Sequence, residues 1–516
     1  MFKKIVNIIK KNLLLFNIQY FNFLFSLRKI KKKNNSNNKI ILADHFEVLE
    51  NLFYRSLVLT ELSNYKKAKV QVFNLKYNLP YYLTYHTLEF VPMKTNLNDV
   101  QKKEVNFLFK KYKTQVKNKI DLFKFSINNV NIGWDIFESY LIRNFKPQVD
   151  LKDLKLKKIV IEALRLYVFW RDYLVNNKIS ALFLSHRMYV ETNILNRLAI
   201  KKKIPVYTIS GDGSSLMKIT TLKLNYFETY KKIFNRLSKN DKSKFINIAK
   251  NDINKKLLGE VGINMKYSKK SAFSNYQFKK NPIKKSKKIN ILICTHCFFD
   301  NPFAYGSRNL FLDFYEWLSF LAKISHKKNY NWFIKPHPDY LPGTIEIIKE
   351  ISKKFKKIKI IDPKASFKQI TENLDYGLTV YGSIAHELPL LGVKVINASL
   401  DNPHKAFNFS ITPNNLKEYT KILNNLTKVK NKNVENKNIY AFYYMHNHFF
   451  KNKLFENLNK ENFYNNSKDL TYFNNYIDNK YYIKDKKIIN KFFNSKKKKL
   501  ISNKKFSNLF ERFSRI

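Results

Sequence analysis

The residues best suited to chemistry lie in the segment Asn331 to Asp339, which reads Asn-Trp-Phe-Ile-Lys-Pro-His-Pro-Asp. Its first four residues have the apolar character of a short buried strand. The two prolines that follow prevent both continued strand pairing and helix formation. Lys335 and His337 are therefore expected to be held rigidly at the carboxyl end of a strand. Ligands bind at that end of open α/β sheets, and this pair suits an anionic group such as a phosphate.

A second candidate phosphate-binding segment reads Tyr381-Gly382-Ser383 and follows another apolar run. Gly382 would allow close approach of the backbone to a ligand, and Ser383 is predicted to cap a helix that runs to Leu391. Unpaired N–H groups and the dipole at a helix start favour a phosphate. Glu387, one turn into this helix, would accept hydrogen bonds from ribose hydroxyls. Each residue alone also fits a structural role, so the prediction depends on the order and spacing of both segments.

Strands and helices alternate strictly over the stretch that contains both segments. We expect strands at residues 289–294, 331–334, 358–361, 376–380 and 394–397, and helices at 310–326, 344–355, 366–373, 383–391 and 414–426. Alternation of this kind predicts a parallel sheet with helical crossovers. The sequence therefore predicts an α/β domain over residues 289–427.

The same alternation occurs twice in the earlier part of the chain. Buried strands are expected at residues 39–45, 68–74, 179–185 and 204–210, with helical patterns between them. This predicts a first Rossmann-like domain over 39–267, joined to the second by a Lys-, Ser- and Asn-rich linker at 268–288. The last of these strands leads into Asp212, which fits either a general base or a tight-turn residue.

Several further polar residues follow the expected strands and could contact a ligand, although a single histidine is more often structural. They are His45, His186, His296, Asp300, Arg308 and His404. Arg308 is the one that we assign to the donor phosphate, because a guanidinium suits phosphate recognition.

The composition constrains the partners. The chain has 516 residues, 44% of them apolar, and a net charge of +57. This apolar content argues against global disorder, and the charge predicts attraction to anionic surfaces. Lys is over-used along the whole chain, as are Asn, Ile, Phe and Tyr, so we take compositional drift as the main cause of the charge. No nucleic-acid reader pattern occurs, and we expect no specific nucleic-acid partner.

The two ends of the chain differ from the rest. Residues 1–38 contain no acidic residue and are expected to form a basic amphipathic extension that can lie on a membrane surface. Residues 428–516 are rich in Lys, Asn and Tyr and are predicted to be partly disordered. No apolar stretch is long enough to span a bilayer, and two cysteines exclude a disulfide scaffold. We expect a cytoplasmic protein, peripheral on the inner membrane.

Three motifs together resemble the capsular polysaccharide biosynthesis glycosyltransferases. They are Lys-Pro-His-Pro at 335–338, Gly-Ser-x-x-x-Glu at 382–387 and Gly-x-x-Val-Ile at 392–396. This family includes bacterial Kdo transferases, and bacterial sialyl- and polysialyltransferases are more distantly similar. The resemblance is good over residues 289–426 and weak over 179–215. It implies the GT-B fold, an α/β architecture of two Rossmann-like domains facing a cleft, here with a basic N-terminal extension and a basic C-terminal tail.

The resemblance also implies roles for single residues. His337 would bind and protonate the leaving nucleotide phosphate, and Ser383 would hydrogen-bond it. In the sialyltransferase relatives an acidic pair followed by glycine supplies the general base. The matching place here has one carboxylate, Asp212, which becomes the candidate base.

We therefore expect a nucleotide-sugar-dependent glycosyltransferase of surface polysaccharide or lipopolysaccharide assembly. A CMP-linked acidic sugar is the favoured donor, and a growing glycan or lipid-linked sugar is the acceptor. No Asp-x-Asp cation motif stands out in these segments. The phosphate charge would fall on Lys335, His337 and Arg308, so transfer is expected to need neither a metal nor a cofactor. The alternatives are a CDP-polyol phosphotransferase of teichoic-acid type and a non-catalytic basic protein that binds membrane or nucleic acid.

Overall fold

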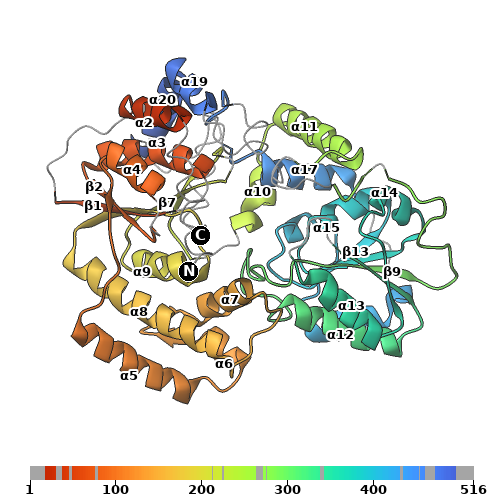
Figure 1. The fold of residues 1–516 in the computed structure, drawn as a ribbon. Coiled ribbons are helices and arrows are strands. Elements are labelled where there is room, and N and C mark those ends of the chain that lie inside the picture. The colour runs from red at the N-terminus through yellow and green to blue at the C-terminus, as the bar shows by residue number, and fades with distance from the viewer. Residues whose placement is uncertain are drawn as a thin grey trace. The chain divides into compact units, whose positions relative to one another are not determined.

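The fold is that of a computed structural model (Figure 1), in which two compact units each contain one main sheet. The described residues are 18–30, 38–45, 49–75, 79–211, 213–222, 226–262, 271–274, 276–336, 342–429, 434–451, 454–458 and 471–494. The first unit comprises residues 1–139, 151–222 and 450–516, and the second comprises 140–150 and 223–449.

The first unit contains a six-stranded sheet in the order β3-β2-β1-β6-β7-β8. All neighbours are parallel except β7 and β8. The strands are β1 (Ile40–Asp44), β2 (Lys69–Phe73), β3 (Val91–Pro92), β6 (Ile179–Phe183), β7 (Val206–Ile209) and β8 (Leu216–Ile219). A separate small hairpin joins β4 (Ser126–Ile127) and β5 (Val130–Asn131).

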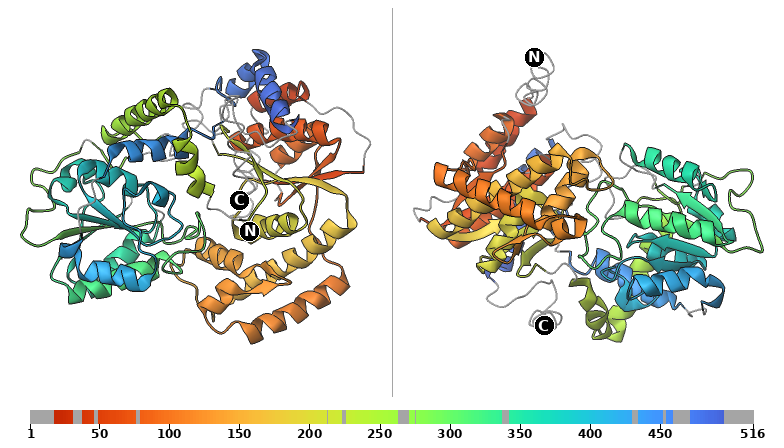
Figure 2. Two further views of the ribbon diagram at one scale, coloured as in Figure 1. Left: turned by 180° about the vertical axis from the view of Figure 1, so that it is seen from behind. Right: turned by 90° about the horizontal axis from the view of Figure 1, so that it is seen from below.

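Helices surround this first sheet and are drawn in red to yellow, and blue near the C-terminus, in Figure 2. They are α2 (Ile18–Arg28), α3 (Leu49–Lys66), α4 (Leu79–Thr87), α5 (Asp99–Gln115), α6 (Lys119–Lys124), α7 (Gly133–Asn144), α8 (Leu154–Asn176), the π-helix η2 (Tyr189–Asn193), α9 (Ile194–Lys201), α19 (Thr471–Asp478) and α20 (Tyr481–Asn494). Helix α7 continues from the first unit into residues assigned to the second.

The second unit contains a five-stranded, fully parallel sheet in the order β11-β10-β9-β12-β13. The strands are β9 (Asn290–Cys294), β10 (Asn331–Lys335), β11 (Ile358–Ile360), β12 (Tyr376–Thr379) and β13 (Lys394–Asn397). The helices are α10 (Tyr230–Asn235), α11 (Lys239–Leu257), α12 (Phe314–Lys327), α13 (Thr344–Lys354), α14 (Phe367–Ile370), α15 (Ile384–Glu387), α16 (Leu416–Asn424) and α17 (Asn436–Asn447). Short 3₁₀ helices occupy Tyr226–Thr229, Thr371–Asn373, Leu388–Leu391, Lys405–Phe407 and Leu426–Lys428.

The apolar strands of the second unit are buried on both faces. Successive side chains of a strand point to opposite faces, and those of β9 divide accordingly between two cores. Ile291 and Ile293 pack in one core, whereas Leu292 and Cys294 pack in the other. A sheet covered on both sides needs apolar residues at every position, which explains the continuous apolar runs of the sequence.

The observed topology confirms the predicted α/β class with two parallel-sheet, Rossmann-like parts. The units do not coincide with the predicted domains at 39–267 and 289–427. Residues 226–262, which carry α10 and α11, belong to the second unit. The expected linker also contributes to that unit's core, because Phe273 and Ile283 are fully buried there.

Both ends of the described chain fold into the first unit. Helix α2 buries Tyr20, Phe23 and Leu27 in the core, although it was predicted to be part of a surface extension. Helices α19 and α20, in a region predicted to be partly disordered, add Phe473 and Ile489 to the same core. The other residues of 1–38 and those from 495 onward lie mostly outside the described chain. Within the described residues, no helix has the length and apolar character needed to cross a bilayer.

Candidate functional site

The second unit has a topological switch point between β9 and β12. The chain proceeds from β9 to β10 and β11 on one side, and then crosses to β12 and β13 on the other. The connections that follow β9 and β12 therefore run to opposite sides. Open α/β sheets bind ligands in the crevice at the carboxyl ends of two such strands. The segment at 381–383 follows β12 directly, so the structure places the second predicted motif at this point.

His296, in the loop after β9, ties that loop to the loop after β12. Its Nε2 lies 3.0 Å from the Thr379 hydroxyl and 3.3 Å from the Val380 amide nitrogen. Its ring stacks on Phe314, with 4.5 Å between the ring centroids. A nitrogen that accepts a backbone N–H must carry a lone pair, so His296 positions the β12 loop as a neutral imidazole.

Gly382 is required by close packing at this loop. Its N–H donates to the Thr379 hydroxyl at 3.1 Å, and an added Cβ would lie 2.8 Å from the same oxygen. A side chain at this position would displace Thr379 or the adjacent His296. The glycine therefore allows the backbone to approach both the loop anchor and any ligand above it.

Ser383 is exposed but does not cap the helix, so that part of the prediction is wrong. Its backbone is itself helical, with φ −60° and ψ −24°, and the side chain makes no capping hydrogen bond. A cap residue needs extended dihedral angles to turn its oxygen toward the N–H groups. Among the described residues, the Ser383 hydroxyl has no hydrogen-bond partner. The predicted helix is also a four-residue helix, α15, followed by a 3₁₀ turn.

Lys335 ends β10 and is buried. Its ammonium donates to the Pro363 carbonyl at 3.0 Å and lies 5.1 Å from the centroid of the Phe367 ring. Burial lowers the pKa of Lys335 to about 8, because the charged form loses hydration. The cation predicted for a phosphate therefore already has a carbonyl and an aromatic partner.

Glu387 is neither on a solvated face nor unpaired. Its carboxylate is buried and forms an ion pair with Lys256 of α11. His386 Nε2 lies 3.8 Å from Oε1, the same carboxylate oxygen. This arrangement ties α11 to the second sheet, which explains why α11 belongs to this unit.

Arg308 is held by two carboxylates. Its guanidinium donates to Asp401 at 2.7 Å and to Glu228 at 2.7 Å, and its backbone N–H donates to the other Asp401 oxygen at 2.7 Å. These partners raise the pKa of Arg308. Arg308 could contact a donor phosphate only if the phosphate displaced at least one of these two carboxylates.

His337 and Asp212, the two predicted catalytic residues, lie outside the described residues. Lys335 and Pro336 precede the first, and Gly211 and Gly213 flank the second. Their roles remain predictions from the sequence. Within the described residues, no group of three or more His, Cys, Asp or Glu side chains is placed to hold a metal ion.

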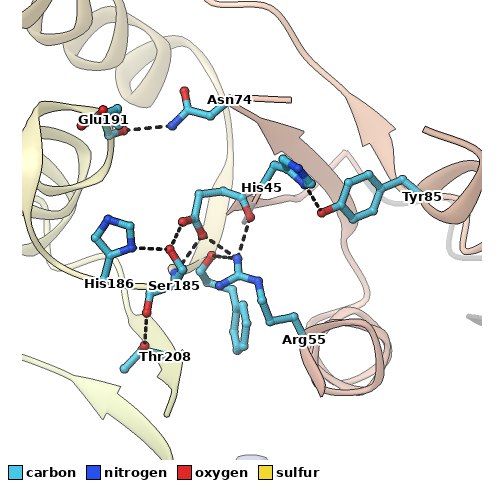
Figure 3. Close-up of polar contacts among 10 residues, drawn as sticks. His45, Arg55, Asn74, Tyr85, Ser185, His186, Glu191 and Thr208 are labelled. Carbon is cyan, nitrogen blue, oxygen red and sulfur yellow. Dashed lines mark hydrogen bonds and ion pairs between the residues drawn. The ribbon is translucent and has the colours of Figure 1, made fainter. Parts of the chain in front are cut away.

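The first unit has a switch point of its own, between β1 and β6. Figure 3 shows polar contacts of Arg55, Ser185 and His186. Asp44 ends β1, and its buried carboxylate forms an ion pair with Arg55 of α3. The same carboxylate accepts the Ser185 N–H at 2.9 Å and the Ser185 hydroxyl. Ser185 Oγ in turn lies 2.7 Å from Nδ1 of His186. Sequence reasoning identified His186 but missed the other three residues, of which Arg55 gives no sequence signal.

Sequence comparison identifies no relative, since no protein family and no curated protein matches the chain. Among solved structures, KpsC β-Kdo 2,7 transferase of Thermosulfurimonas dismutans is similar at 15% identity, with a TM-score of 0.33, over 62% of this chain and 88% of that one. The β-Kdo 2,4 transferase of KpsC from the same organism gives 12% identity and a TM-score of 0.32 over 52% and 79%. Anabaena Alr3699/HepE, solved with UDP and glucose, gives 10% identity and a TM-score of 0.25 over 86% and 99%. TM-scores this low do not establish a shared overall fold, and the fold class stated above rests on the sheet topology of this chain.

Proposed function

We propose that this chain is a glycosyltransferase that takes a sugar from a nucleotide-activated donor. The observation that carries the proposal is the loop at 381–383. It lies at the switch point of a parallel sheet, and it combines a glycine required by close packing with an exposed serine hydroxyl that has no partner in the described chain. Ligands bind at the carboxyl ends of the strands of a parallel sheet. A phosphate bound there could contact both the closely approaching backbone and the hydroxyl donor.

The roles within this proposal follow from charge. The bond from sugar to phosphate breaks with its electron pair on the phosphate, so the leaving group needs hydrogen-bond donors and positive charge. Ser383 would supply a hydroxyl donor, Gly382 would let the backbone approach the phosphate, and His337 would supply a proton. Lys335 would add charge, although its side chain must then turn from Pro363. Glu387 would contact the donor only by releasing Lys256. Arg308 would contact it only by releasing a carboxylate partner such as Glu228.

The donor that we favour is a CMP-linked acidic sugar, as in the family that the motifs resemble. The acceptor would be a cell-surface glycan or a lipid-linked sugar on the cytoplasmic side of the inner membrane. Two observations support work beside an anionic bilayer: the net charge of +57 and the exposure of Phe21 and Phe25 on α2, at 50% and 64%.

Nucleotide-dependent thermal stability tests the proposal. A ligand that binds only the folded state raises stability by about 2.7 kcal/mol at 100 times its Kd. We expect CMP to raise the Tm of the full chain more than UDP or GDP does, and Ser383→Ala to reduce that increase. Ser126→Ala, at an exposed serine of the other unit, should respond like wild type.

The remaining outcomes are informative. A response to CDP in preference to CMP would favour the polyol-phosphate alternative. Equal Tm values with and without all four nucleotides would contradict the proposed function.

A further inference from the structure

Helix α2 has one side in the core of the first unit and an apolar side in solvent. Tyr20, Phe23 and Leu27 are buried, whereas Phe21 and Phe25 are 50% and 64% exposed. The two exposed rings are four residues apart, so they lie on the same side of the helix. Single exposed apolar residues are ordinary. Two phenylalanines on one side of a helix form an apolar stripe that the folding of the unit does not explain.

Helix α4 adds to this apolar side (Figure 1). It packs against α2, where the Tyr20 hydroxyl lies 3.2 Å from the Thr84 hydroxyl. Both helices bury residues in the same core, Tyr20 from α2 and Tyr85 from α4, so their other sides face away from that core. Leu79 and Tyr82, three residues apart, are exposed on α4. We call the exposed side of this helix pair the α2–α4 face, and its apolar members are Phe21, Phe25, Leu79 and Tyr82.

The charge beside the α2–α4 face is positive. Neither α2 nor α4 contains an acidic residue, and α2 ends at the exposed Arg28. Arg28 follows Phe25 by three residues and therefore lies on the same side of the helix. Residues 1–17, which lead into α2, contain four lysines and no Asp or Glu. Apolar rings beside cations match an anionic bilayer, in which rings enter the boundary of headgroups and acyl chains and cations meet lipid phosphates.

The C-terminal end of the chain brings further cations to the same part of the first unit. Helix α19 lies beside α2, to which it is joined by the ion pair of Lys29 with Asp478 at 2.8 Å. Helix α20 follows it and exposes Lys487 and Lys491. Residues 495–516, which come next, contain eight Lys or Arg and a single Glu. Both basic ends of the chain are therefore connected to helices beside the α2–α4 face.

We propose that the α2–α4 face docks the chain on an anionic lipid bilayer, with its four apolar side chains in the interfacial region and Arg28 at the lipid phosphates. The inference deepens the proposed function, and it rests on that function for the presence of the acceptor at a membrane. Because α2 is anchored in the core, the rings are presented by a folded surface. Binding therefore does not have to order a free helix, which would reduce the affinity.

Co-sedimentation of the full chain with vesicles measures the docking. We expect wild type to bind vesicles of phosphatidylglycerol and phosphatidylcholine, and to bind pure phosphatidylcholine about 10-fold or more weakly. The double variant Phe21→Ala/Phe25→Ala should bind the anionic vesicles about 10-fold or more weakly, since it removes apolar area that enters the interface. Phe107→Ala, at an exposed phenylalanine of α5 in the same unit, is the matched control and should bind like wild type.

The charged contact has a separate variant. Arg28→Gln should bind anionic vesicles about fivefold more weakly, because one cation near the surface is lost. Lys110→Gln, at an exposed lysine of α5, is its control. Salt at about 0.5 M should reduce the effect of Arg28→Gln, because it screens exposed charges. The difference between wild type and the double phenylalanine variant should persist.

A tryptophan reports whether the ring at position 25 enters the lipid. Phe25→Trp should add emission that vesicles containing brominated phosphatidylcholine quench, beyond any quenching of wild type. Phe107→Trp should add emission that the same vesicles leave unchanged. Equal quenching of the two variants would contradict insertion through the α2–α4 face.

The remaining outcomes separate the docking from the proposed function. Vesicle binding by the double variant at wild-type strength, or an equal loss in Phe107→Ala, would overturn the docking. Loss of a concentration-dependent dimer in the double variant, with vesicle binding unchanged, would assign the face to a second copy of the chain. A CMP-induced increase in Tm equal to that of wild type shows that the double variant is folded. Stabilisation of wild type by CMP without vesicle binding would overturn the docking alone, whereas vesicle binding without a response to any nucleotide would overturn the glycosyltransferase alone.

Discussion

At the scale of single residues, Lys335 shows how far burial changes a role read from the sequence. The sequence places a lysine at a strand end, where an ammonium would meet a phosphate. In the structure the side chain is buried against Pro363 and Phe367. The depressed pKa of about 8 follows, and it has a measurable consequence for stability.

Lys335→Met should remove part of the pH dependence of stability. The unfolded lysine, with a pKa of 10.5, binds a proton that the folded one has released above about 8. Stability due to this residue therefore rises from pH 8 to 10.5, by about 3 kcal/mol in total. The difference in Tm between wild type and Lys335→Met should grow in favour of wild type over that range. Lys359→Met, at an exposed position of β11, is the control, and identical pH profiles for all three proteins would contradict the burial.

At the scale of elements, α17 packs beside three histidines, of which His386 and His404 are buried and His446 is half-buried. His446 of α17 stacks near Phe442, with 5.3 Å between ring centroids, and His386 and His404 contact the same phenylalanine ring. Burial lowers the pKa of all three, to about 4 for His446. Neutral imidazoles are therefore part of what packs α17 on the second unit.

The packing of α17 should weaken in acid. The unfolded histidine has a pKa of 6.5, so as pH falls from 6.5 toward 4 it binds a proton that folded His446 does not. The folded state therefore loses about 3 kcal/mol over that window through this residue. We expect His446→Phe to reduce the drop in Tm between pH 7 and pH 5. His326→Phe, at an exposed histidine, should keep the full drop, and a full drop in His446→Phe would contradict the assignment.

At the scale of the whole molecule, the first unit is closed by both ends of the described chain. Phe473 of α19 lies 5.7 Å from Phe23 of α2 and 4.4 Å from Phe53 of α3, measured between ring centroids. Asn490 of α20 donates to Glu61 of α3 at 2.7 Å. The C-terminal region therefore completes a core that begins with α2.

Phe473→Ala should destabilise the first unit by about 3–5 kcal/mol, because it leaves a cavity among aromatic rings. Urea unfolding should show an earlier transition for the variant. Phe107→Ala, at a phenylalanine that is 66% exposed, should stay within about 0.5 kcal/mol of wild type. Equal midpoints for the two variants would exclude a structural role for α19.

The sequence by itself determined the parallel second sheet and the four inner strands of the first, which are β2, β1, β6 and β7. Strands buried on both faces need unbroken apolar runs, and such runs can be read directly, so the five strands of the second unit fall within a residue or so of their predicted bounds. The sequence also placed Gly382 and Ser383 after a strand. Only the tertiary structure decided the partners of the polar residues. Lys335, Glu387 and Arg308 pair with groups 28, 131 and 93 residues away, and no local pattern encodes such contacts. For the same physical reason the Asp44–Ser185–His186 arrangement, in which Asp44 and Ser185 are 141 residues apart, emerged only when β1 and β6 became neighbours.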